Sequence, residues 1–478
     1  MLLRVSWDLA KAGFGSRNLT LWNMASKLGL LSLKLSTTAV SSNKVVDVAA
    51  QEGEFRVFIV AGEVSGDSIA SRLMVSLKKL SPLPVRFAGV GGFLMSKEGL
   101  QTLFPMEEIS VMGLWELLPH LNTFRKKLKE TTEAALLFRP HVVITVDSKG
   151  FSFRLLKQLK AKYLLEDTCP VHVHYVAPSF WAWKGGEARL QNLCKFVDHM
   201  LCIIPFEEEI CRLNGLAATY VGHPLLEDAL MLNLESAFMS NNLKVHKSGD
   251  VFRREHGIPP GATVITLLPG SRLQEVKRIL PIFLRTIEII RNSFSELSVI
   301  ILVAPNNHVK DLVDKIIKSS SLPAILVPGA SLDQKYEAFS ASTAALCASG
   351  SAVIELQLAR LPCIVAYQTH ILTELVIHYR TKLKYISLPN ILMNTSIIPE
   401  VLFRDCTPGN LATILSELIL DKKIQEQQTS TAEKFLGLLC PPSKNVNMLR
   451  GNLSSGIIWC PSMIAASTIL SIQKQKRD

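Results

Sequence analysis

The chain has 478 residues, which is too long for one hydrophobic core and predicts two domains with appendages. Its composition, 48% hydrophobic and 19% charged, describes a well-buried globular protein and excludes a largely disordered one. The net charge is +11, and the basic residues are not interleaved with aromatic ones. It therefore gives little support to nucleic-acid binding and fits an anionic substrate or an anionic membrane surface equally well.

Residues 1–50 form a distinct leader. Residues 1–44 contain six Lys or Arg residues and Asp8 as their single acid, so nearly half of the net charge belongs here. A basic stretch that is rich in Ser and Thr predicts an organellar transit peptide, with the mitochondrion as first choice and the plastid as second. A disordered basic tail is the alternative. The apolar run 28–33 is too short to span a bilayer.

The nine cysteines include no C-x-x-C pair, and no His/Cys cluster has the spacing of a zinc site. Cys347 and Cys363 lie in apolar runs, where cysteine behaves as a small buried hydrophobic residue. We therefore expect a reducing compartment and no metal.

A strand, a turn and a helix open the folded part of the chain. Residues 55–61 are an apolar strand, residues 62–67 (GEVSGD) a small polar turn, and residues 69–80 a helix with apolar residues every three or four positions. Ser65 or Asp67 is positioned to cap this helix. A Gly/Ser turn between a strand and a helix is typical of phosphate-binding edges in doubly wound folds, so the turn predicts a cleft without naming its ligand.

The segment 109–121 (ISVMGLWELLPHL) has more apolar residues than one helix face needs. This surplus, with a tryptophan at its boundary and Lys and Arg residues at 125–129, predicts an acyl-chain groove or an interfacial membrane contact. A helix buried on several sides is the alternative. The residues expected to contact lipid or membrane are Val111, Met112, Leu114, Trp115 and Leu118.

Two further strands end in residues that can carry chemistry. Residues 142–146 form a β-branched strand that ends at Asp147, and the carboxyl ends of parallel strands border the cleft of an open sheet. Asp147 is therefore a candidate general base. Residues 172–177 form the next strand and lead into the aromatic loop 178–183 (PSFWAW). His174 on this strand is a supporting site residue, although most such histidines are hydrogen-bonded core residues.

A loosely patterned segment, residues 227–261, predicts a linker. A second series of strands and helices follows, with the turn PGSR at 269–272 between a strand at 264–268 and a long amphipathic helix at 273–291. This turn offers glycine backbone donors, a hydroxyl and a guanidinium within four residues, a set that suits a diphosphate. Further strands are expected at 299–303, 324–327, 343–347 and 364–367.

The stretch 344–367 has the pattern strand, helix, strand, with Ser349, Gly350 and Ser351 in its first turn. Bare helix N-termini at such turns bind anions. Glu355, one turn into the helix, would repel a phosphate but can accept hydrogen bonds from a ribose diol further out. An ordinary buried crossover with a capping serine is the alternative.

These elements predict an α/β protein with two doubly wound, Rossmann-like domains that face a central cleft. This is the GT-B architecture of glycosyltransferases that bind a nucleotide sugar in the second domain and the acceptor in the first. The expected parts are a leader at 1–50, an acceptor domain at 55–226, a linker at 227–261, a nucleotide-sugar domain at 262–420, and a helical tail at 421–478. The family resemblance given next implies that the first domain also binds lipid, that the nucleotide is UDP, and that the tail packs back toward the first domain.

Eight short motifs resemble those of the lipid-A-disaccharide synthases, the inverting glycosyltransferases of lipid A biosynthesis. They occur in family order, cover roughly residues 55–420, and are VAGEVSGD (60–67), VMG (111–113), HYVAPSFWAW (174–183), IIPFE (203–207), VGHPL (221–225), LLPGSR (267–272), ASGSAVIE (348–355) and SLPN (387–390). With the leader, the chain resembles the organellar, plant-type form of that family.

The resemblance implies a hexosyltransferase that needs no metal or other cofactor and binds peripherally to a membrane, here the matrix side of the mitochondrial inner membrane. It implies UDP-2,3-diacylglucosamine as the donor and 2,3-diacylglucosamine 1-phosphate as the acceptor. The products are then UDP and a β-1,6-linked tetraacyl disaccharide 1-phosphate. Nucleic acid is not an expected partner, and a homodimer is left open.

In such a reaction a carboxylate takes the proton of the attacking sugar hydroxyl, and backbone and guanidinium donors bind the departing UDP. We assign Asp147 as the base, with Glu63 and Asp67 as rivals, and Arg272 to the leaving group. The residues expected to bind substrate or UDP are Ser65, Gly66, His174, Gly270, Ser271, Ser349, Gly350, Ser351, Glu355 and Asn390.

Two departures from the family pattern leave alternatives open. Bacterial members typically read D-x-P-D-F where this chain has Asp147 followed by Ser, Lys, Gly and Phe, so a second carboxylate is absent at Gly150. Residues 435–461 read like an insertion in a helical region. The alternative functions are a non-catalytic lipid- or UDP-binding homologue, and a soluble UDP-N-acetylglucosamine epimerase or transferase.

Overall fold

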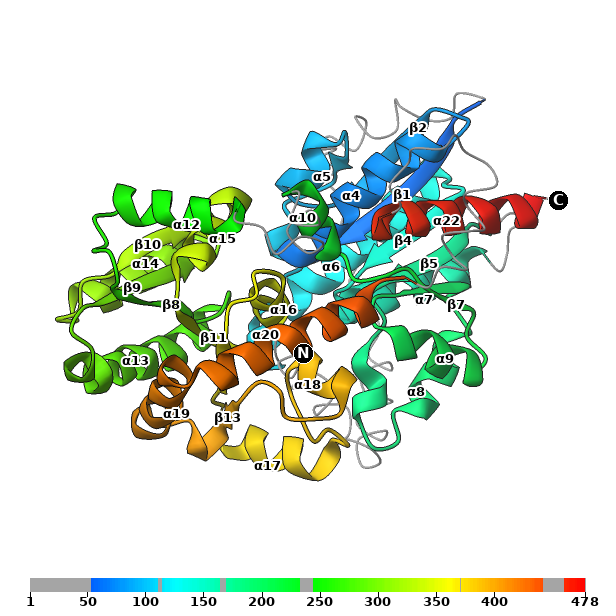
Figure 1. Ribbon diagram of the computed structural model, residues 1–478. Coiled ribbons are helices and arrows are strands. Elements are labelled where there is room, and N and C mark those ends of the chain that lie inside the picture. Colours follow the sequence, from blue (N-terminus) through cyan, green and yellow to red (C-terminus); the bar gives the residue numbers. More distant parts are fainter. Residues whose placement is uncertain are drawn as a thin grey trace, which may run out of the picture. The chain divides into compact units, whose positions relative to one another are not determined.

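A computed structural model of the chain describes residues 53–110, 114–163, 169–232, 244–369, 371–441 and 460–477 (Figure 1). These residues belong to two compact units. The earlier unit runs to Gly222 and resumes at Pro441, and the later unit comprises His223–Cys440. The expected leader, residues 1–50, lies outside the described residues.

The sheet of the earlier unit has seven parallel strands in the order β3-β2-β1-β4-β5-β6-β7. Its central strands are covered on both faces, and this explains why they read as continuous apolar runs. The strand order reverses between β1 and β4, the point at which doubly wound folds bind ligands. The strands are β1 (Phe55–Ala61), β2 (Val85–Val90), β3 (Gln101–Thr102), β4 (Val142–Val146), β5 (Val171–Tyr175), β6 (His199–Cys202) and β7 (Ala218–Tyr220).

The helices of the earlier unit pack on this sheet through apolar stripes. In α4 (Val64–Leu80), Leu73 and Leu77 lie one turn apart and are fully buried. Helix α22 (Pro461–Arg477) packs beside α4 and contacts β5, so a segment from the far end of the sequence completes this unit (Figure 1). The other helices are α5 (Phe93–Lys97), α6 (Leu114–Phe138), α7 (Lys149–Tyr163), α8 (Glu187–Leu193) and α9 (Pro205–Leu213), with 3-10 turns at Met106–Glu108 and Ser179–Ala182.

The sheet of the later unit has six parallel strands in the order β10-β9-β8-β11-β12-β13, again with a reversal next to the first strand. The strands are β8 (Thr263–Leu268), β9 (Leu297–Val303), β10 (Ile325–Pro328), β11 (Ala344–Ala348), β12 (Cys363–Tyr367) and β13 (Glu400–Leu402). The prediction of an α/β protein with two doubly wound, Rossmann-like sheets is therefore confirmed.

Several helices of the later unit pack against one another. Helix α13 packs against α14 and α19, and α16 packs against α20. The helices are α10 (Leu226–Met231), α12 (Lys244–Glu255), α13 (Leu273–Ile290), α14 (Asn307–Lys318), α15 (Leu332–Ala341), α16 (Ser351–Leu358), α17 (Ile371–Arg380), α18 (Leu388–Met393), α19 (Pro408–Leu420) and α20 (Lys422–Leu439), with 3-10 turns at Arg291–Ser293 and Phe403–Asp405.

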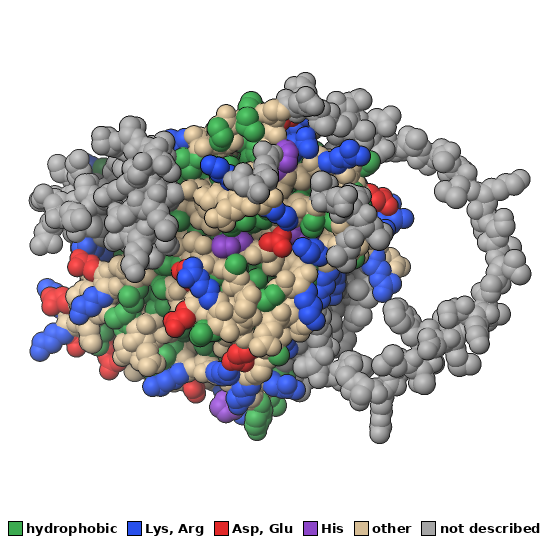
Figure 2. Space-filling model, turned by 90° about the vertical axis from the view of Figure 1, so that its right-hand side faces the viewer, with side chains coloured by type: hydrophobic (Ala, Val, Ile, Leu, Met, Phe, Trp, Pro, Cys, Tyr) green, Lys and Arg blue, Asp and Glu red, His purple; other side chains and the backbone are tan. Residues whose placement is uncertain are grey.

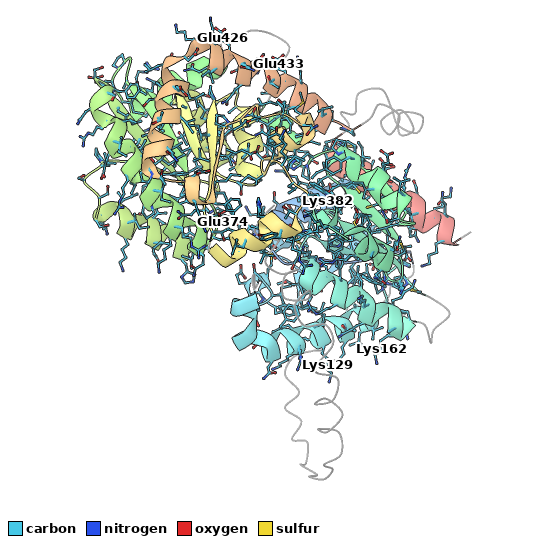
Figure 3. All side chains as sticks on the ribbon, turned by 90° about the horizontal axis from the view of Figure 1, so that it is seen from below. Lys129, Lys162, Glu374, Lys382, Glu426 and Glu433 are labelled. Carbon is cyan, nitrogen blue, oxygen red and sulfur yellow. The ribbon has the colours of Figure 1, made fainter. Side chains whose placement is uncertain are left out.

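The structure differs from the expected domain boundaries in two places. The expected linker, 227–261, contains α12, which packs against α15 and buries Phe252, so its polar composition marks a solvent-facing helix rather than a free connection. The expected tail is divided, because α20 belongs to the later unit and α22 to the earlier one. Glu433 on α20, labelled in Figure 3, has its Oε1 2.8 Å from Nη2 of Arg360 beyond the end of α16. Most of the expected insertion, residues 442–459, lies outside the described residues.

Candidate active site

In the earlier unit, the carboxyl ends of β1, β4 and β5 lie at one level of the sheet. Ala61 pairs with Val146, and Val146 pairs with Tyr175, so Gly62 and Asp147 follow directly at the switch point. The N–H of Asp147 donates to the carbonyl of Tyr175 at 2.9 Å, and this fixes the backbone of Asp147 on the neighbouring strand. The structure thus places Asp147 at the edge where an open α/β sheet binds its ligand.

The backbone at this edge is held in an unusual conformation. Asp147 and Ser148 have φ of 52° and 39°, and Val176, which follows β5, has φ of 77°. Non-glycine residues rarely adopt positive φ, and for a β-branched residue the conformation is a genuine outlier. Such strain gathers at functional sites, where the surrounding structure holds it in place. The side chain of Asp147 is largely buried by these turns.

Gly62 is required at this point because Ser148 fills the space beside it. A Cβ atom built on Gly62 would lie 2.5 Å from the hydroxyl oxygen of Ser148, closer than real Cβ contacts come. The two turns therefore lie close together at the switch point.

The other residues of the 62–67 motif are arranged differently from the expected loop. Helix α4 begins at Val64, so Ser65 and Gly66 lie in its first turn, with Ser65 exposed and Gly66 buried. Glu63 is the half-buried N-cap residue of α4, and its side chain makes no cap hydrogen bond. Glu63 therefore stays beside the turn as a rival to Asp147.

Asp67 has a structural task in this unit. Its carboxylate accepts hydrogen bonds from the backbone N–H groups of Gly92, Leu94 and Met95, at 2.9, 3.0 and 3.0 Å. A carboxylate that accepts hydrogen bonds from the backbone at the N-terminus of α5 in this way is committed to the fold. This geometry argues against Asp67 as the base.

His174 lies inside the sheet and does not reach its edge. Its ring is almost fully buried, its Nδ1 lies 2.7 Å from the hydroxyl of Thr145 on β4, and its ring centroid is 4.7 Å from that of Phe153. These contacts are those of a core histidine, which was the alternative that the sequence left open. They argue against a role in substrate binding.

In the later unit, two glycine-containing turns follow neighbouring strands. Leu268 of β8 pairs with Cys347 of β11, so the turn at 269–272 and the turn at 349–351 begin side by side at the switch point. Helices α13 and α16 start from these turns, and their N-terminal N–H groups and dipoles favour an anion at this edge. The structure thus brings together the two motifs that the sequence assigned to a diphosphate.

The turn at 349–351 has open space and an unused polar group. Gly350 has φ of 130° and ψ of −152°, a conformation that only glycine adopts readily, and a Cβ atom built there would meet nothing within 4 Å. The hydroxyl oxygen of Ser349 is buried, and no described group hydrogen-bonds to it. A buried hydroxyl without a protein partner indicates a place for a polar ligand.

Sequence patterns did not single out Glu275, which lies at the same edge of the later sheet. It lies in the first turn of α13, and its Oε2 accepts from the N–H of Ser271 at 3.2 Å, while no described group reaches its buried Oε1. Burial raises the pKa of the Glu275 carboxyl, and the nearby charge of Arg272 opposes that shift. The signal was available, since Glu275 is the first-turn acid of a helix that follows a glycine turn.

Glu355 lies one turn into α16, as expected, but it already has a partner. Its Oε1 accepts from the ammonium Nζ of Lys335 on α15 at 2.7 Å. Burial raises the pKa of the Glu355 carboxyl and Lys335 opposes this, while the acid Asp228 adds to the rise. No local sequence pattern predicted the pairing of Lys335 with Glu355, because the two residues lie on different helices.

Asn390 uses its side-chain amide within the fold. Its side chain is fully buried and its Nδ2 donates to the carbonyl of Ile398 and to Glu400, at 2.8 and 2.9 Å. Its Oδ1 accepts from the N–H groups of Ile397 and Ile398, at 2.9 and 3.0 Å. The amide is fully used in holding the segment after α18, and this argues against the expected contact with a phosphate or sugar.

The expected lipid-contact segment can be followed only in part. Val111 and Met112 lie outside the described residues, and Leu114, Trp115 and Leu118 fall on the first turns of α6, where only the helix itself is described. Within the described ranges, no helix has the length and apolarity to cross a bilayer. Nor do three or more His, Cys, Asp or Glu side chains gather there at metal-binding spacing. On the face in Figure 2, the coloured basic and acidic side chains are interspersed and form no continuous basic stripe.

Comparison with known proteins adds the following similarities. A family model described as lipid-A-disaccharide synthetase matches residues 57–447. A protein from Arabidopsis thaliana, named probable lipid-A-disaccharide synthase, mitochondrial, is 56% identical over 438 residues, which cover 91% of this chain and 95% of the relative. The lipid-A-disaccharide synthase of Rhodospirillum centenum is 40% identical over 372 residues, or 78% of this chain and 87% of the relative.

Solved structures with a similar fold are more distant in sequence. The UDP-GlcNAc 2-epimerase from Neisseria meningitidis bound to UDP-GlcNAc aligns with a TM-score of 0.53 at 14% identity, over 84% of this chain and 100% of that one. The S. aureus MnaA structure with UDP aligns with a TM-score of 0.52 at 12% identity, over 84% and 98%. At these identities the similarity concerns the fold alone.

Proposed function

The chain belongs to the lipid-A-disaccharide synthase family and is a glycosyltransferase of lipid A biosynthesis, and from this premise we propose its substrates and the residues that serve them. The donor is UDP-2,3-diacylglucosamine and the acceptor is 2,3-diacylglucosamine 1-phosphate. A hydroxyl of the acceptor attacks the anomeric carbon of the donor sugar, the bond from that carbon to UDP breaks, and the β-1,6-linked disaccharide 1-phosphate and UDP are released.

The later unit binds the UDP part of the donor. The observation that carries this assignment is the pairing of the turns 269–272 and 349–351 at the ends of β8 and β11. The N–H groups there, the Ser349 hydroxyl and the guanidinium of Arg272 are donors for a diphosphate and for the charge that develops on it as it leaves. Gly270, Ser271, Gly350 and Ser351 supply backbone donors, and Glu355 accepts from the ribose.

The earlier unit supplies the base. Asp147 takes the proton of the attacking hydroxyl, since its carboxylate lies at the switch point on a strained turn, and Glu63 is its remaining rival. Gly150 stands where bacterial members carry a second carboxylate, so Asp147 performs this task without that group. Ser65 and Gly66, in the first turn of α4, border the acceptor.

Contact with a membrane surface belongs to the same proposal, because both substrates carry acyl chains. In the described residues, α5 supports it: the side chains of Phe93 and Leu94 are 71% and 40% exposed, and the Nζ of Lys97 lies 4.6 Å from the centre of the Phe93 ring. An exposed aromatic residue beside a lysine suits an anionic lipid surface. The apolar surplus of the sequence at 109–121 supports the same membrane contact. We place the protein on the matrix side of the mitochondrial inner membrane.

The experiment that tests the proposal is a mass-spectrometric assay with both defined acylated substrates, run in chelator beside an Asp147→Asn variant. We expect the disaccharide 1-phosphate and UDP in equal amounts from the wild type and far less from the variant. UDP binding without product would identify a non-catalytic homologue. Equal turnover of unacylated UDP-N-acetylglucosamine would identify a soluble epimerase or transferase.

A further inference from the structure

Lys335 is a buried lysine that the proposed reaction does not use. It lies on α15 of the later unit with 7% of its surface exposed, and lysine is almost never buried to this extent without a partner. Its partner is Glu355 on α16, whose Oε1 lies 2.7 Å from the Lys335 Nζ. The two residues are 20 positions apart, and β11 separates their helices in the chain.

The pair leaves part of the Glu355 carboxylate available to a ligand. Lys335 occupies one site on Oε1, and among the described residues no hydrogen bond reaches Oε2. The Glu355 side chain keeps 16% of its surface exposed, whereas the Lys335 side chain keeps 8%. A carboxylate has about four acceptor sites, so enough remain for the two hydroxyls of a ribose.

We propose that Lys335 is a positioning residue, which holds the Glu355 carboxylate in the orientation that accepts hydrogen bonds from the ribose hydroxyls of the bound nucleotide. This inference rests on the proposed function, because it assumes that the later unit binds UDP. Lys335 itself touches no substrate; it acts through Glu355.

The physical reason is that Glu355 is poorly placed to stay charged by itself. Burial and the nearby Asp228 both raise the pKa of its carboxyl, and Lys335 is the cation that opposes them. A protonated carboxyl loses acceptor capacity and gains a donor, so it matches a diol less well. A glutamate side chain also has three rotatable bonds, and a fixed cation limits where its carboxylate can lie.

A purely structural role makes a different prediction. Buried ion pairs are weak evidence for stability, and the loss of Lys335 would then lower the stability of the unit without changing how it tells ribose from deoxyribose. The informative readout is therefore the preference for UDP over 2′,3′-dideoxy-UDP, which lacks both hydroxyls. Binding of the second nucleotide reports the uracil and diphosphate contacts alone.

The experiment is calorimetric titration of the full chain with the two nucleotides, for the wild type, Lys335→Met, Glu355→Gln and the double variant. We expect the wild type to prefer UDP by about tenfold or more, the gain from hydrogen bonds to a charged acceptor. Lys335→Met and Glu355→Gln should each bring the preference close to one, with dideoxy-UDP affinity unchanged. The double variant should match Glu355→Gln, because Lys335 acts only through that carboxylate.

Lys318→Met is the matched control, since Lys318 is exposed at the end of α14 and the same charge is removed. It should keep the wild-type preference. If Lys335→Met does not fold, Lys335→Gln retains a hydrogen-bond donor in the same space without the charge and is read in the same way.

Two results would overturn the inference alone: a folded Lys335 variant that keeps the wild-type preference while Glu355→Gln loses it, or one that weakens both nucleotides equally. A wild type that binds neither nucleotide, or binds both equally, would remove the proposed UDP or ribose contact, and the inference with it.

Discussion

The hydroxyl of Ser76 on α4 and the hydroxyl of Ser462 on α22 share a hydrogen bond of 2.8 Å, although 386 positions separate them. Both are buried in the earlier unit, so the contact joins the first helix of that unit to its last. The neighbouring residues of α22 are apolar and enclosed, with Ala466 and Ile469 fully buried in the same core. Helix α22 is therefore a part of the core and not an appendage.

Truncating the core side chain of α22 should destabilise the earlier unit. We expect Ile469→Ala to lower the free energy of unfolding by about 2–5 kcal/mol, because a buried isoleucine leaves a cavity when it is shortened. Urea unfolding followed by circular dichroism measures this. Lys474→Ala, exposed on the same helix, should change the value by less than about 0.5 kcal/mol. Equal, small changes in both variants would contradict the assignment of α22 to the core.

Removing the guanidinium of Arg272 should slow turnover. Arg272→Ala is expected to lower kcat roughly 10²- to 10³-fold, because one donor to the developing charge on UDP is lost. The assay is UDP release with both acylated substrates in chelator. Arg285→Ala removes an exposed arginine from the same helix and should keep the wild-type rate. Persistence of the full rate in Arg272→Ala would exclude its role at the diphosphate.

Asp147 and Asp67 should respond differently to substitution. Asp147→Asn should lower kcat by about 10²- to 10⁴-fold with UDP affinity unchanged, because a general base is lost. Asp67→Ala should lower the free energy of unfolding by about 1–3 kcal/mol, because Gly92 and two residues of α5 lose the acceptor of their N–H groups. Parallel kinetic and unfolding measurements separate the two effects. A kinetic defect confined to the Asp67 variant would reverse our assignment.

Stability should fall in mild acid because of buried histidines. Burial lowers the pKa of His172 to about 4, from an ordinary value of 6.5. The unfolded chain therefore binds a proton at this residue between pH 6.5 and 4 that the folded chain does not, and the free energy of unfolding decreases as the pH falls through this window.

His172→Asn should reduce that decrease. Asparagine can keep a hydrogen bond to the carbonyl of Phe196, which Nδ1 of His172 contacts at 3.0 Å, and it does not titrate. Comparing urea unfolding at pH 7.0 and 4.5, we expect the wild type to lose on the order of 2 kcal/mol more than the variant. Identical losses would show that His172 does not contribute.

The exposed apolar residues of α5 should contribute to membrane binding. Phe93→Ser and Leu94→Ser are each expected to weaken sedimentation with vesicles that contain anionic lipid by roughly tenfold, because each withdraws an apolar side chain from the lipid. Leu213→Ser is the control, since Leu213 is 78% exposed on α9 of the same unit. If all three variants bind equally well, α5 does not touch the membrane.

Local sequence was sufficient for the central strands of the two sheets and for the turns that follow β8 and β11, but not for the short edge strands β3 and β13. An apolar run, a Gly/Ser turn and an amphipathic helix are each coded within a few residues, so Gly270 and Gly350 could be placed beforehand. The contacts that decide what a side chain does could not be predicted from local sequence. Asp67 is bound by N–H groups more than 20 positions away, and Lys335 reaches Glu355 from another helix, because tertiary packing brings these partners together.

The same dependence on tertiary contacts explains why local sequence did not reveal the hydrogen bonds of Asn390 or the packing of α12. Asn390 sits in a motif of the family, but Glu400 and the backbone beyond α18 use its whole hydrogen-bonding capacity, which no spacing rule reveals. Helix α12 is polar enough to read as a connection, and only its packing against α15 distinguishes the two. Composition reports exposure to water and not whether a segment is ordered.

The return of α22 to the earlier unit also sets an order of events during synthesis. A chain grows from its N-terminus, so β1 to β7 leave the ribosome before residues 461–477 are made. Until then, the side of α4 that contacts α22 stays uncovered. The stretch from His223 to Cys440 is continuous and can mature first. The half of the molecule that is translated first is thus the half that is completed last.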